Sequence, residues 1–469
     1  MTTSNPSSTS TASEEPAGAG RGDRAAAVDP ARLLDDRIAE GVFAVHREAF
    51  TSEAVHALEV ERIFERTWVY VGHESQVAKP NDYITTTVGR QPVLVTRDAK
   101  GQLHGLLNSC RHRGMVVCPL RAGNQKFHTC RYHGWVYDSA GANRQVSAQD
   151  VGRYPQAFNA QQLGLVPVAR FDAYRGFLFA SLHADVPPLD EHLGDSRPFL
   201  DLIADQATEQ GLEFVPGAVT YTFDANWKMQ IENALDMYHF AYVHVSYLDL
   251  VRSRAQSPAA LPPPDGEQGS FSFGRGHALM WRSHSRVTSE LLARRSATFA
   301  GRMSEAALKW SSFGRNLTIF PNMQIVDNVS SMMLRVIRPL SARKTEMQTW
   351  CIAPKGEPAA ERAARIREYE DFFNPSGLAT PDDNVIYEQC QTGMAAAAAG
   401  WTAGYLRGID RRGLPDTSPH AQELGLSGSQ WIAGPRTLGD ESCFHDAYRE
   451  WARLLRQAPA AVPAAEGLR

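Results

Sequence analysis

Two short motifs, each pairing a cysteine with a histidine, constrain this 469-residue chain more than any other feature. Cys110 and His112 are separated by one residue, and Cys130 and His133, which follow after a spacer, are separated by two. Thiolate and imidazole groups that recur in pairs on two loops are typical of a metal site with mixed sulfur and nitrogen ligands. Two such pairs arise together as inert buried side chains only about one time in a hundred. We therefore predict a metal centre at these four residues.

Two kinds of centre use this set of ligands. One is a tetrahedral zinc site, and the other is a Rieske 2Fe-2S cluster, in which both thiolates bind one iron and both imidazoles bind the second. A glycine closely follows each motif, Gly114 and Gly134. Glycines at these places allow backbone amides to turn toward bridging sulfides, which a zinc site does not require. The Rieske cluster is therefore the favoured interpretation. The remaining cysteines are expected to be core or surface thiols: Cys118, Cys351, Cys390 and Cys443.

A second metal site is predicted around residues 226–244, which read NWKMQIENALDMYHFAYVH and have a helical pattern. His244 lies five residues beyond His239, about 140° further around an ideal helix, so both imidazoles can bind one metal only if the helix bends or ends between them. Two imidazoles and one carboxylate form the facial triad of non-heme Fe(II) oxygenases. The pair Asp382-Asp383 is the candidate source of the carboxylate. The cluster motif strengthens this hypothesis, because a one-electron donor needs a group to reduce.

The rest of the chain is organised around these motifs. Residues 1–34 lack the apolar stretch of a secretory signal, so we expect a disordered tail and a cytoplasmic protein. A helical pattern covers Val55–Trp68, short strand-like runs fill 68–182, and helices and strands alternate after Pro187-Pro188. The net charge of −4 and the absence of a long apolar run argue against nucleic acid and membrane partners.

The chain resembles the α subunits of Rieske non-heme iron ring-hydroxylating oxygenases over residues 45–455. The two Cys–His motifs and the set Asp236–His244 with Asp383 carry this resemblance. Within the family, the sequence is most similar to the benzoate and anthranilate dioxygenase branch. This likeness is seen in the segments 72–98 (GHESQVAKPNDYITTTVGRQPVLVTRD), 174–182 (YRGFLFASL), 351–357 (CIAPKGE) and 369–383 (YEDFFNPSGLATPDD). Leu235 and Met237 depart from the small residues usual in that branch, so the exact substrate is not implied.

The resemblance implies an α+β fold, in which an all-β Rieske domain is inserted in a catalytic domain built from an antiparallel sheet covered by helices. The expected divisions are a tail 1–34, an N-terminal helical part of the catalytic domain 35–67, the Rieske domain 68–183, the catalytic domain 184–455 and a loose tail 456–469.

The same resemblance implies roles for individual residues. The implied ligands of the 2Fe-2S cluster are Cys110, His112, Cys130 and His133. Those of the mononuclear iron are His239, His244 and Asp383, with Asp382 in reserve. Asp236 is implied to bridge an iron-ligating histidine to His133 of a neighbouring subunit, and Asn233 to lie next to the iron ligands. This arrangement implies a ring-shaped trimer of α subunits, with or without added β subunits.

The implied reaction adds both atoms of O₂ to adjacent carbons of a carboxylated aromatic ring, giving a cis-diol or catechol precursor. Electrons come from NAD(P)H through a separate flavin and iron–sulfur reductase, with or without a ferredoxin, and enter at the Rieske cluster, whose histidines raise its potential. The carboxylate of such a substrate needs a cation in the pocket to bind it, and Arg315 and Arg335 are the candidates. Two alternatives stay open: a Rieske monooxygenase or demethylase with the same metals, and a Rieske electron carrier, in which everything after Leu182 has no role.

Overall fold

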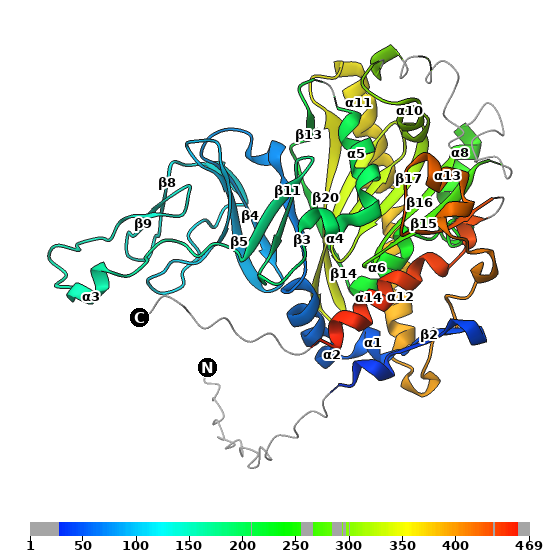
Figure 1. Ribbon diagram of the computed structural model, residues 1–469, viewed down its shortest axis with the longest axis horizontal. Helices are drawn as coiled ribbons and strands as arrows, with labels where there is room; N and C mark the ends of the chain where they lie inside the picture. The colour runs from blue at the N-terminus through cyan, green and yellow to red at the C-terminus, as the bar shows by residue number, and fades with distance from the viewer. Residues whose placement is uncertain are drawn as a thin grey trace, which may run out of the picture.

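The computed structural model describes residues 28–207, 209–254, 266–283, 301–434 and 437–457, together with residues 293 and 297–299. A large body of helices and sheet carries a smaller, β-rich arm that extends to one side (Figure 1). The tails expected at 1–34 and 456–469 lie mostly outside the described residues. The structured part begins earlier than the expected boundary at residue 35, because Leu33 and Leu34 are buried and belong to the same core cluster as Phe43.

The N-terminal part of the body is a hairpin followed by helices. Its elements are β1 (Leu34–Arg37), β2 (Val42–Val45), α1 (Glu48–Thr51) and α2 (Glu53–Glu59), and α2 continues into a π-helical turn, Val60–Phe64. The helix therefore starts two residues before the expected Val55 and ends four residues before Trp68. The buried Glu59 carboxylate accepts hydrogen bonds from Lys228 and Trp227 and, at 2.7 Å, from Trp451 near the C-terminal end of the described chain. The two ends of the described chain are thus joined in the core.

The arm contains three antiparallel sheets, with the strand orders β6-β5-β4-β7, β10-β9-β8 and β11-β12-β3. Strand β3, which enters the arm, pairs with β12, which leaves it, so both connections to the body lie side by side. This is the topology of an inserted domain. The strands are β3 (Val69–His73), β4 (Asp82–Val88), β5 (Gln91–Arg97), β6 (Leu103–Leu107), β7 (Ala122–Asn124), β8 (Phe127–Thr129), β9 (Val136–Asp138), β10 (Asn143–Gln145), β11 (Arg170–Tyr174) and β12 (Phe177–Ser181), with one short helix, α3 (Gln156–Asn159).

The body is built on an antiparallel sheet with the order β13-β20-β19-β18-β17-β16-β15-β21, and β14 also pairs with β20. Its strands are β13 (Leu212–Phe214), β14 (Val219–Phe223), β15 (Gln268–Gly274), β16 (His277–Ser283), β17 (Phe313–Ile319), β18 (Met323–Asp327), β19 (Met332–Ser341), β20 (Lys344–Pro354) and β21 (Gln430–Ala433). The helices of the body that follow the arm are α4 (Leu189–Leu193), α5 (Arg197–Asp205), α6 (Trp227–Ala234), α7 (Phe240–Val243), α8 (Val245–Arg254), α10 (Glu305–Ser311), α11 (Ala359–Glu368), α12 (Thr380–Met394), α13 (Pro419–Glu423) and α14 (His445–Leu455).

Both faces of this sheet are covered by helices. Met280 and Met347 share a core cluster with Trp227 of α6 and Trp451 of α14, whereas Leu279 and Leu317 share another with Phe199 of α5. Because side chains alternate along a strand, neighbouring residues of β17 point to opposite faces. The predicted α+β fold, with a β domain inserted in a helix-covered antiparallel sheet, is confirmed, and the face that carries α6 and α12 is the one that holds the catalytic candidates.

Candidate metal centres

The two Cys–His loops of the arm share one hydrogen-bonding plan. In each loop the cysteine N–H donates to the carbonyl oxygen five residues later at 2.8 Å, and the cysteine carbonyl accepts from the glycine N–H four residues later at 2.9 Å. Those glycines, Gly114 and Gly134, have φ angles of 73° and 71°, a region that disfavours residues with a Cβ. Each loop therefore turns in the same way and presents Cys110 and Cys130 equivalently.

The side chains of these loops converge on one place. The rings of His112 and His133 lie 4.5 Å apart between centroids, and Trp135 stacks on His112 with an interplanar angle of 6°. The Nδ1 atoms of both histidines are buried and have no hydrogen-bond partner among the described residues, while Cys110 and Cys130 are buried, free thiols. A buried imidazole nitrogen without a partner is costly unless it binds something else. The four residues therefore fit a 2Fe-2S cluster of the Rieske type.

Tyr137 supports the first of these loops. Its hydroxyl lies 3.2 Å from Cys110 Sγ and accepts a hydrogen bond of 3.1 Å from the backbone N–H of Arg111. Because that hydroxyl oxygen already accepts from the amide, its own proton is free to donate to the sulfur. Hydrogen bonds to ligand sulfur tune the reduction potential of iron–sulfur clusters, so Tyr137 is a further candidate residue of this centre, which motif spacing did not reveal.

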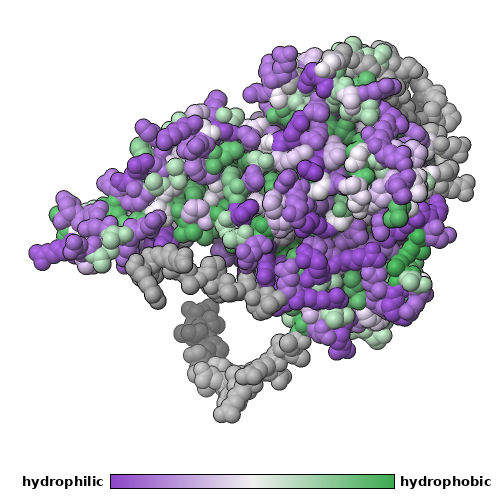
Figure 2. All heavy atoms as spheres, viewed as in Figure 1, coloured by the Kyte–Doolittle hydropathy of each residue, from purple (hydrophilic) through white to green (hydrophobic). Residues whose placement is uncertain are grey.

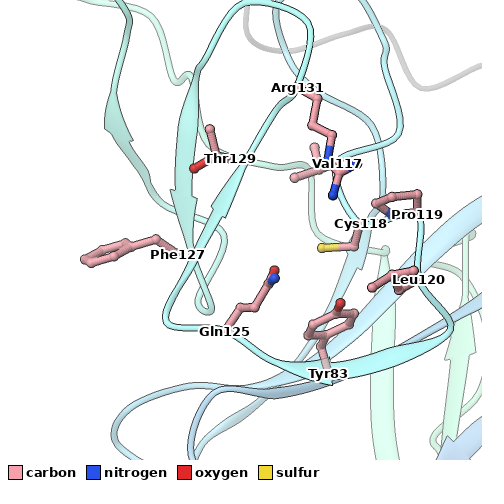
Figure 3. A pocket seen from close by; sticks show the side chains of 9 residues that line it. All are labelled: Tyr83, Val117, Cys118, Pro119, Leu120, Gln125, Phe127, Thr129 and Arg131. Carbon is pink, nitrogen blue, oxygen red and sulfur yellow. The ribbon is translucent and has the colours of Figure 1, made fainter.

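Cys118 lies near this centre but has a different environment. Its Sγ is 3.1 Å from Nδ1 of the buried His128, and burial raises the pKa of the thiol to about 12. Figure 3 shows its sulfur beside a hollow that Tyr83 and Arg131 also line. Cys351 and Cys443 are buried and Cys390 is exposed, all free thiols. These four cysteines therefore have the ordinary environments expected for them.

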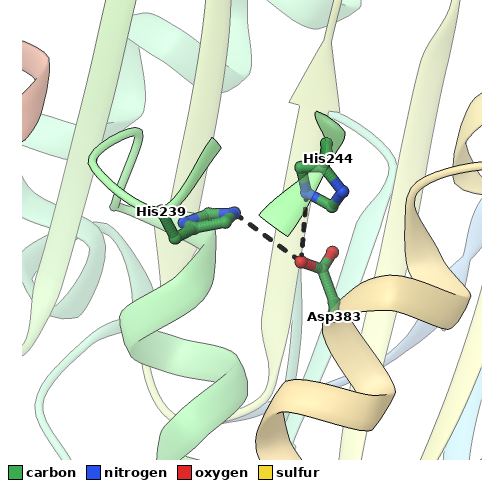
Figure 4. A group of neighbouring side chains, drawn as sticks. All are labelled: His239, His244 and Asp383. Carbon is green, nitrogen blue, oxygen red and sulfur yellow. Dashed lines mark ion pairs between the residues drawn. The ribbon is translucent and has the colours of Figure 1, made fainter. Parts of the chain in front are cut away.

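Three residues of the body form a second group, His239, His244 and Asp383 (Figure 4). Asp383 Oδ1 lies 3.6 Å from Nε2 of His239 and 3.2 Å from Nε2 of His244. One ligand atom from each of the three side chains lies within 4.8 Å of the others, which is close enough to share one metal ion. Two imidazoles and one carboxylate fit a facial triad for ferrous iron, because they leave the other coordination positions open.

The helix breaks where the two histidines require it. Helix α6 ends at Ala234, and the carboxylate of Asp236 then accepts a hydrogen bond from the backbone N–H of Tyr238. Such local side-chain bonds compete with helical ones and stop a helix. The short helix α7 begins at Phe240, one residue after His239, and ends just before His244. Because each histidine lies at an end of α7, both imidazoles can face the same point.

The carboxylate comes from the start of another helix. Pro381 lies in the first turn of α12, where its missing N–H is tolerated, and Asp382 and Asp383 follow in the same turn, where negative charge is favourable. Figure 4 shows Asp383 projecting from this helix toward both histidines. The sequence motif Pro-Asp-Asp therefore positions one acid at the metal site through helix-starting chemistry.

A carboxylate also lies beside Nδ1 of each histidine, which is the ring nitrogen on the side away from Asp383. Asp236 Oδ2 lies 3.1 Å from Nδ1 of His239, and Asp382 Oδ2 lies 3.4 Å from Nδ1 of His244. Asp382 is thus outside the group of three, beside the outer nitrogen of His244. Burial lowers the pKa of His244, but its hydrogen bonds with Asp383 and Asp382 raise it more. Such partners fix the orientation and tautomer of metal-binding histidines.

Asn233, on the last turn of α6, connects two members of the group. Its Nδ2 donates to Asp383 Oδ1 at 3.1 Å and lies 3.2 Å from Nε2 of His239. Asn233 therefore lies next to the three residues, as the resemblance implied.

A small open cavity of about 50 Å³ adjoins the three residues. Arg335 on β19 lines it, but Arg315 does not. The side chain of Arg315 lies on the opposite face of the sheet, where it forms a buried ion pair with Asp327. The prediction that Arg315 contacts substrate is therefore not supported, because its neighbour Asn316 takes the cavity side of β17. Arg282, at the end of β16, also lines the cavity, and sequence reasoning missed it.

Comparison with known proteins agrees with both centres. Residues 67–157 match the Rieske [2Fe-2S] domain, and residues 215–455 match the catalytic domain of the ring hydroxylating alpha subunit. The chain is 41% identical to toluate 1,2-dioxygenase subunit alpha of Pseudomonas putida, covering 91% of this chain and 94% of that protein. The chain belongs to the Rieske ring-hydroxylating oxygenase α subunits. As a member of this family it has a Rieske 2Fe-2S cluster and a mononuclear iron as its cofactors, and it is an oxidoreductase.

Further relatives and solved structures agree with this assignment. The α subunit is 37% identical to the 2-halobenzoate 1,2-dioxygenase large subunit of Burkholderia cepacia, covering 90% of this chain and 91% of that protein. Its fold matches naphthalene 1,2-dioxygenase from Rhodococcus sp. bound to indole, with a TM-score of 0.74 and 25% identity over 88% of this chain and 94% of that one. None of the described helices has the length and apolar character needed to cross a lipid bilayer.

Proposed function

We propose that this α subunit adds both atoms of O₂ to a carboxylated aromatic ring. One observation carries the proposal: the three-residue group opens onto a cavity that contains the buried guanidinium of Arg335. Relatives named for toluate, 2-halobenzoate and anthranilate, at 41%, 37% and 36% identity, support an aromatic carboxylate as the substrate.

The proposed iron ligands are Nε2 of His239, Nε2 of His244 and Oδ1 of Asp383. The proposed cluster ligands are Cys110, His112, Cys130 and His133. When bound, the cluster supplies single electrons, and the mononuclear iron supplies open coordination positions for dioxygen chemistry.

The chain's own residues prepare the site for that chemistry. Asp236 and Asp382 accept hydrogen bonds from the outer nitrogens of the two histidines, so both imidazoles keep Nε2 toward Asp383. The amide of Asn233 holds Asp383 Oδ1 from a third direction. Arg335 can receive the substrate carboxylate through paired charge-assisted hydrogen bonds and so fix which ring carbons face the iron.

We further propose that the subunit works in a ring-shaped trimer, with or without β subunits. Large apolar side chains are exposed on the arm near the cluster loops, including Met115, Val116 and Tyr132, and others are exposed beside Asp236, including Tyr238 and Tyr242. In Figure 2 the arm shows apolar patches among hydrophilic residues. Exposed apolar groups at both places support docking of the arm of one subunit near Asp236 of the next.

Electrons are proposed to come from NAD(P)H through a separate reductase, with or without a ferredoxin, in the cytoplasm. A protein that only carried electrons would not need the group formed by His239, His244 and Asp383. A monooxygenase or demethylase with the same metals is the alternative that product analysis must separate.

The first test measures iron and acid-labile sulfide in the purified protein, with an EPR spectrum after reduction. Wild type should hold three irons and two sulfides per chain, and His239→Ala should keep the Rieske signal with two irons. His183→Ala, which changes a histidine just after β12 that belongs to neither group of ligands, is the control and should keep all three. A variant that retains its third iron, or a wild type that never holds one, contradicts the proposed iron ligands.

The second test separates the two reactions. Benzoate is supplied with ¹⁸O₂ and the product is analysed by mass spectrometry. Two labelled oxygen atoms in a cis-diol support dioxygenation, whereas one labelled atom supports a monooxygenase and overturns the proposal.

A further inference from the structure

A buried tyrosine of the arm lies against one of the two cysteines of the cluster centre. Tyr137 is 0% exposed and lies on β9, the middle strand of its sheet, where it pairs with His128 of β8 and Asn143 of β10. It belongs to the same core cluster as Cys110 and Cys130. Because dense packing on both sides fixes the ring, the hydroxyl stays beside the first cluster loop.

The direction of its hydrogen bond follows from the neighbouring groups. The hydroxyl oxygen accepts from the backbone N–H of Arg111 at 3.1 Å and lies 3.2 Å from Cys110 Sγ. A cysteine that ligates a metal is a thiolate, so its sulfur can only accept. Burial raises the pKa of Tyr137, so the phenol keeps its proton. A buried hydroxyl without an acceptor is costly, and the hydroxyl of Tyr137 therefore donates to Cys110.

The second loop lacks this contact, although the two loops turn alike. Backbone N–H groups of Tyr132 and His133 lie beside the sulfur of Cys130, and no tyrosine hydroxyl of the described chain is at hydrogen-bonding distance from it. Tyr83, the other tyrosine of the same core cluster, is 2% exposed and lines the hollow next to Cys118 (Figure 3). One ligand sulfur thus has a side-chain donor, and the other does not.

Reduction of the cluster changes the strength of this hydrogen bond. The cluster gains one electron while the phenol proton stays on its oxygen, so the sulfur becomes more negative. Hydrogen bonds to a charged acceptor are roughly twice as strong as those to a neutral one. The bond therefore stabilises the reduced cluster more than the oxidised cluster, and a more stable reduced state has a higher reduction potential.

We propose that Tyr137 raises the reduction potential of the 2Fe-2S cluster through its hydrogen bond to Cys110, and so sets how readily the arm accepts an electron. Tyr137 acts through a ligand and is a positioning residue. The higher potential eases reduction by the electron donor and leaves a smaller driving force for transfer to the mononuclear iron. The inference rests on the proposed cluster ligands and does not depend on the aromatic substrate.

The experiment is a redox titration of the complete, cluster-loaded oxygenase, followed by the EPR signal of the reduced cluster. Tyr137→Phe removes the hydroxyl and keeps the ring. Its equilibrium constant for reduction should fall on the order of fivefold, which is about 40 mV because tenfold is about 59 mV for one electron. Tyr83→Phe removes a buried hydroxyl from the same core cluster and is the matched control, which should keep the wild-type potential.

A second replacement tests the opposite direction. Incorporation of 3-fluorotyrosine at position 137 keeps the hydroxyl and makes it a stronger hydrogen-bond donor, because fluorine withdraws electrons from the ring. The potential should then be higher than that of wild type. A residue that only supported the fold would not give shifts of opposite sign in the two proteins.

The outcomes decide between the possibilities. Iron and acid-labile sulfide show whether each protein holds its cluster. If Tyr137→Phe with a full cluster keeps the wild-type potential, or if Tyr83→Phe lowers it equally, the proposal is wrong. If Tyr137→Phe does not hold its cluster, the fluorotyrosine protein decides, and a potential equal to or below wild type overturns the proposal. A wild type without a Rieske signal contradicts the proposed cluster ligands themselves.

Discussion

The two metal centres of this subunit are built in opposite ways. All four cluster candidates lie within residues 110–133, on two loops that repeat the same hydrogen bonds and the same glycine turn. The iron candidates span residues 239–383 and come from a broken helix and from the first turn of α12. The first centre depends on local backbone geometry, whereas the second depends on how helices pack over the sheet. Substitutions in the cluster loops should therefore destabilise the cluster by straining its turns. Substitutions near the iron should act by removing the hydrogen-bond partners of the iron ligands.

The largest expected effect concerns those partners. Asp236→Asn keeps an oxygen that can accept from Tyr238 N–H, so the break in the helix should survive, but it removes the negative charge 3.1 Å from His239. Turnover should fall on the order of 100-fold, with iron content nearly unchanged. Asp382→Asn is the matched change at His244, where the distance is 3.4 Å, and should cost about tenfold. Steady-state kinetics with iron analysis checks both.

An equal loss in the two variants would mean that Asp236 acts only by orienting its histidine. A larger loss for Asp236→Asn is expected if this residue also contacts the arm of the neighbouring subunit. Activity close to wild type in Asp236→Asn would contradict both roles.

The next effect compares the two cluster loops. An added Cβ at Gly134 would lie 2.5 Å from Ser147 Oγ, but at Gly114 its nearest neighbour is Ser109 Oγ at 3.8 Å. Both alanine variants should lose about 1–2 kcal/mol from the left-handed backbone angle. Gly134→Ala should lose about 1 kcal/mol more, because Ser147 must move and give up its hydrogen bond to the Gly134 carbonyl. The temperature at which each variant loses the visible absorption of its cluster compares their stabilities, and Gly134→Ala should have the lower midpoint. A lower midpoint for Gly114→Ala would contradict this prediction.

The remaining effect depends on pH and concerns Glu232, an acid on the last turn of α6. Burial raises the pKa of Glu232 from 4.5 to about 7, against the hydrogen bonds from Tyr448 and Tyr405. In the unfolded chain the carboxyl loses its proton near 4.5, so wild type loses stability as the pH rises from 4.5 to 7. Glu232→Gln has no such proton. Its stability relative to wild type should therefore increase across that window, by about 3 kcal/mol for a shift of this size, and stay level above it.

Thermal unfolding of the holoenzyme between pH 5 and 8 tests this sign. A stability difference that is constant with pH would mean that Glu232 titrates normally in the folded protein. The Rieske absorption midpoint serves as the control, because Glu232 lies in the body and not in the arm.

The contrast between the centres also explains what could be predicted from the sequence. The cluster loops were predictable because ligand spacing and glycines lie in one short stretch. The need for a break near His239 followed from helix geometry, but its cause, the bond from Tyr238 N–H to Asp236, did not. Likewise, Pro-Asp-Asp offered two acids, and only packing shows that Asp383 faces the histidines while Asp382 stands behind one of them.

The arginines show the same limit more sharply. Alternation along β17 and β19 shows that neighbouring residues face opposite ways, but it does not show which face carries the cavity. Arg315 and Arg335 therefore looked equivalent, and the partner Asp327 could be assigned only in three dimensions. Arg282 follows the apolar run ALMW, and a single cation at the end of such a strand was the available signal.

The positions of the chain ends set the order in which this subunit can be completed on the ribosome. The arm closes when β12 pairs with β3, so all of its strands exist once residue 181 has been made. The core of the body is still incomplete at that point, because Glu59 near its beginning is hydrogen-bonded to Trp451 near its end. Domains form as units while the chain emerges, so the electron-carrying arm can mature first and the oxygen-handling site last. The reactive centre is thus assembled only after nearly the whole chain has been made.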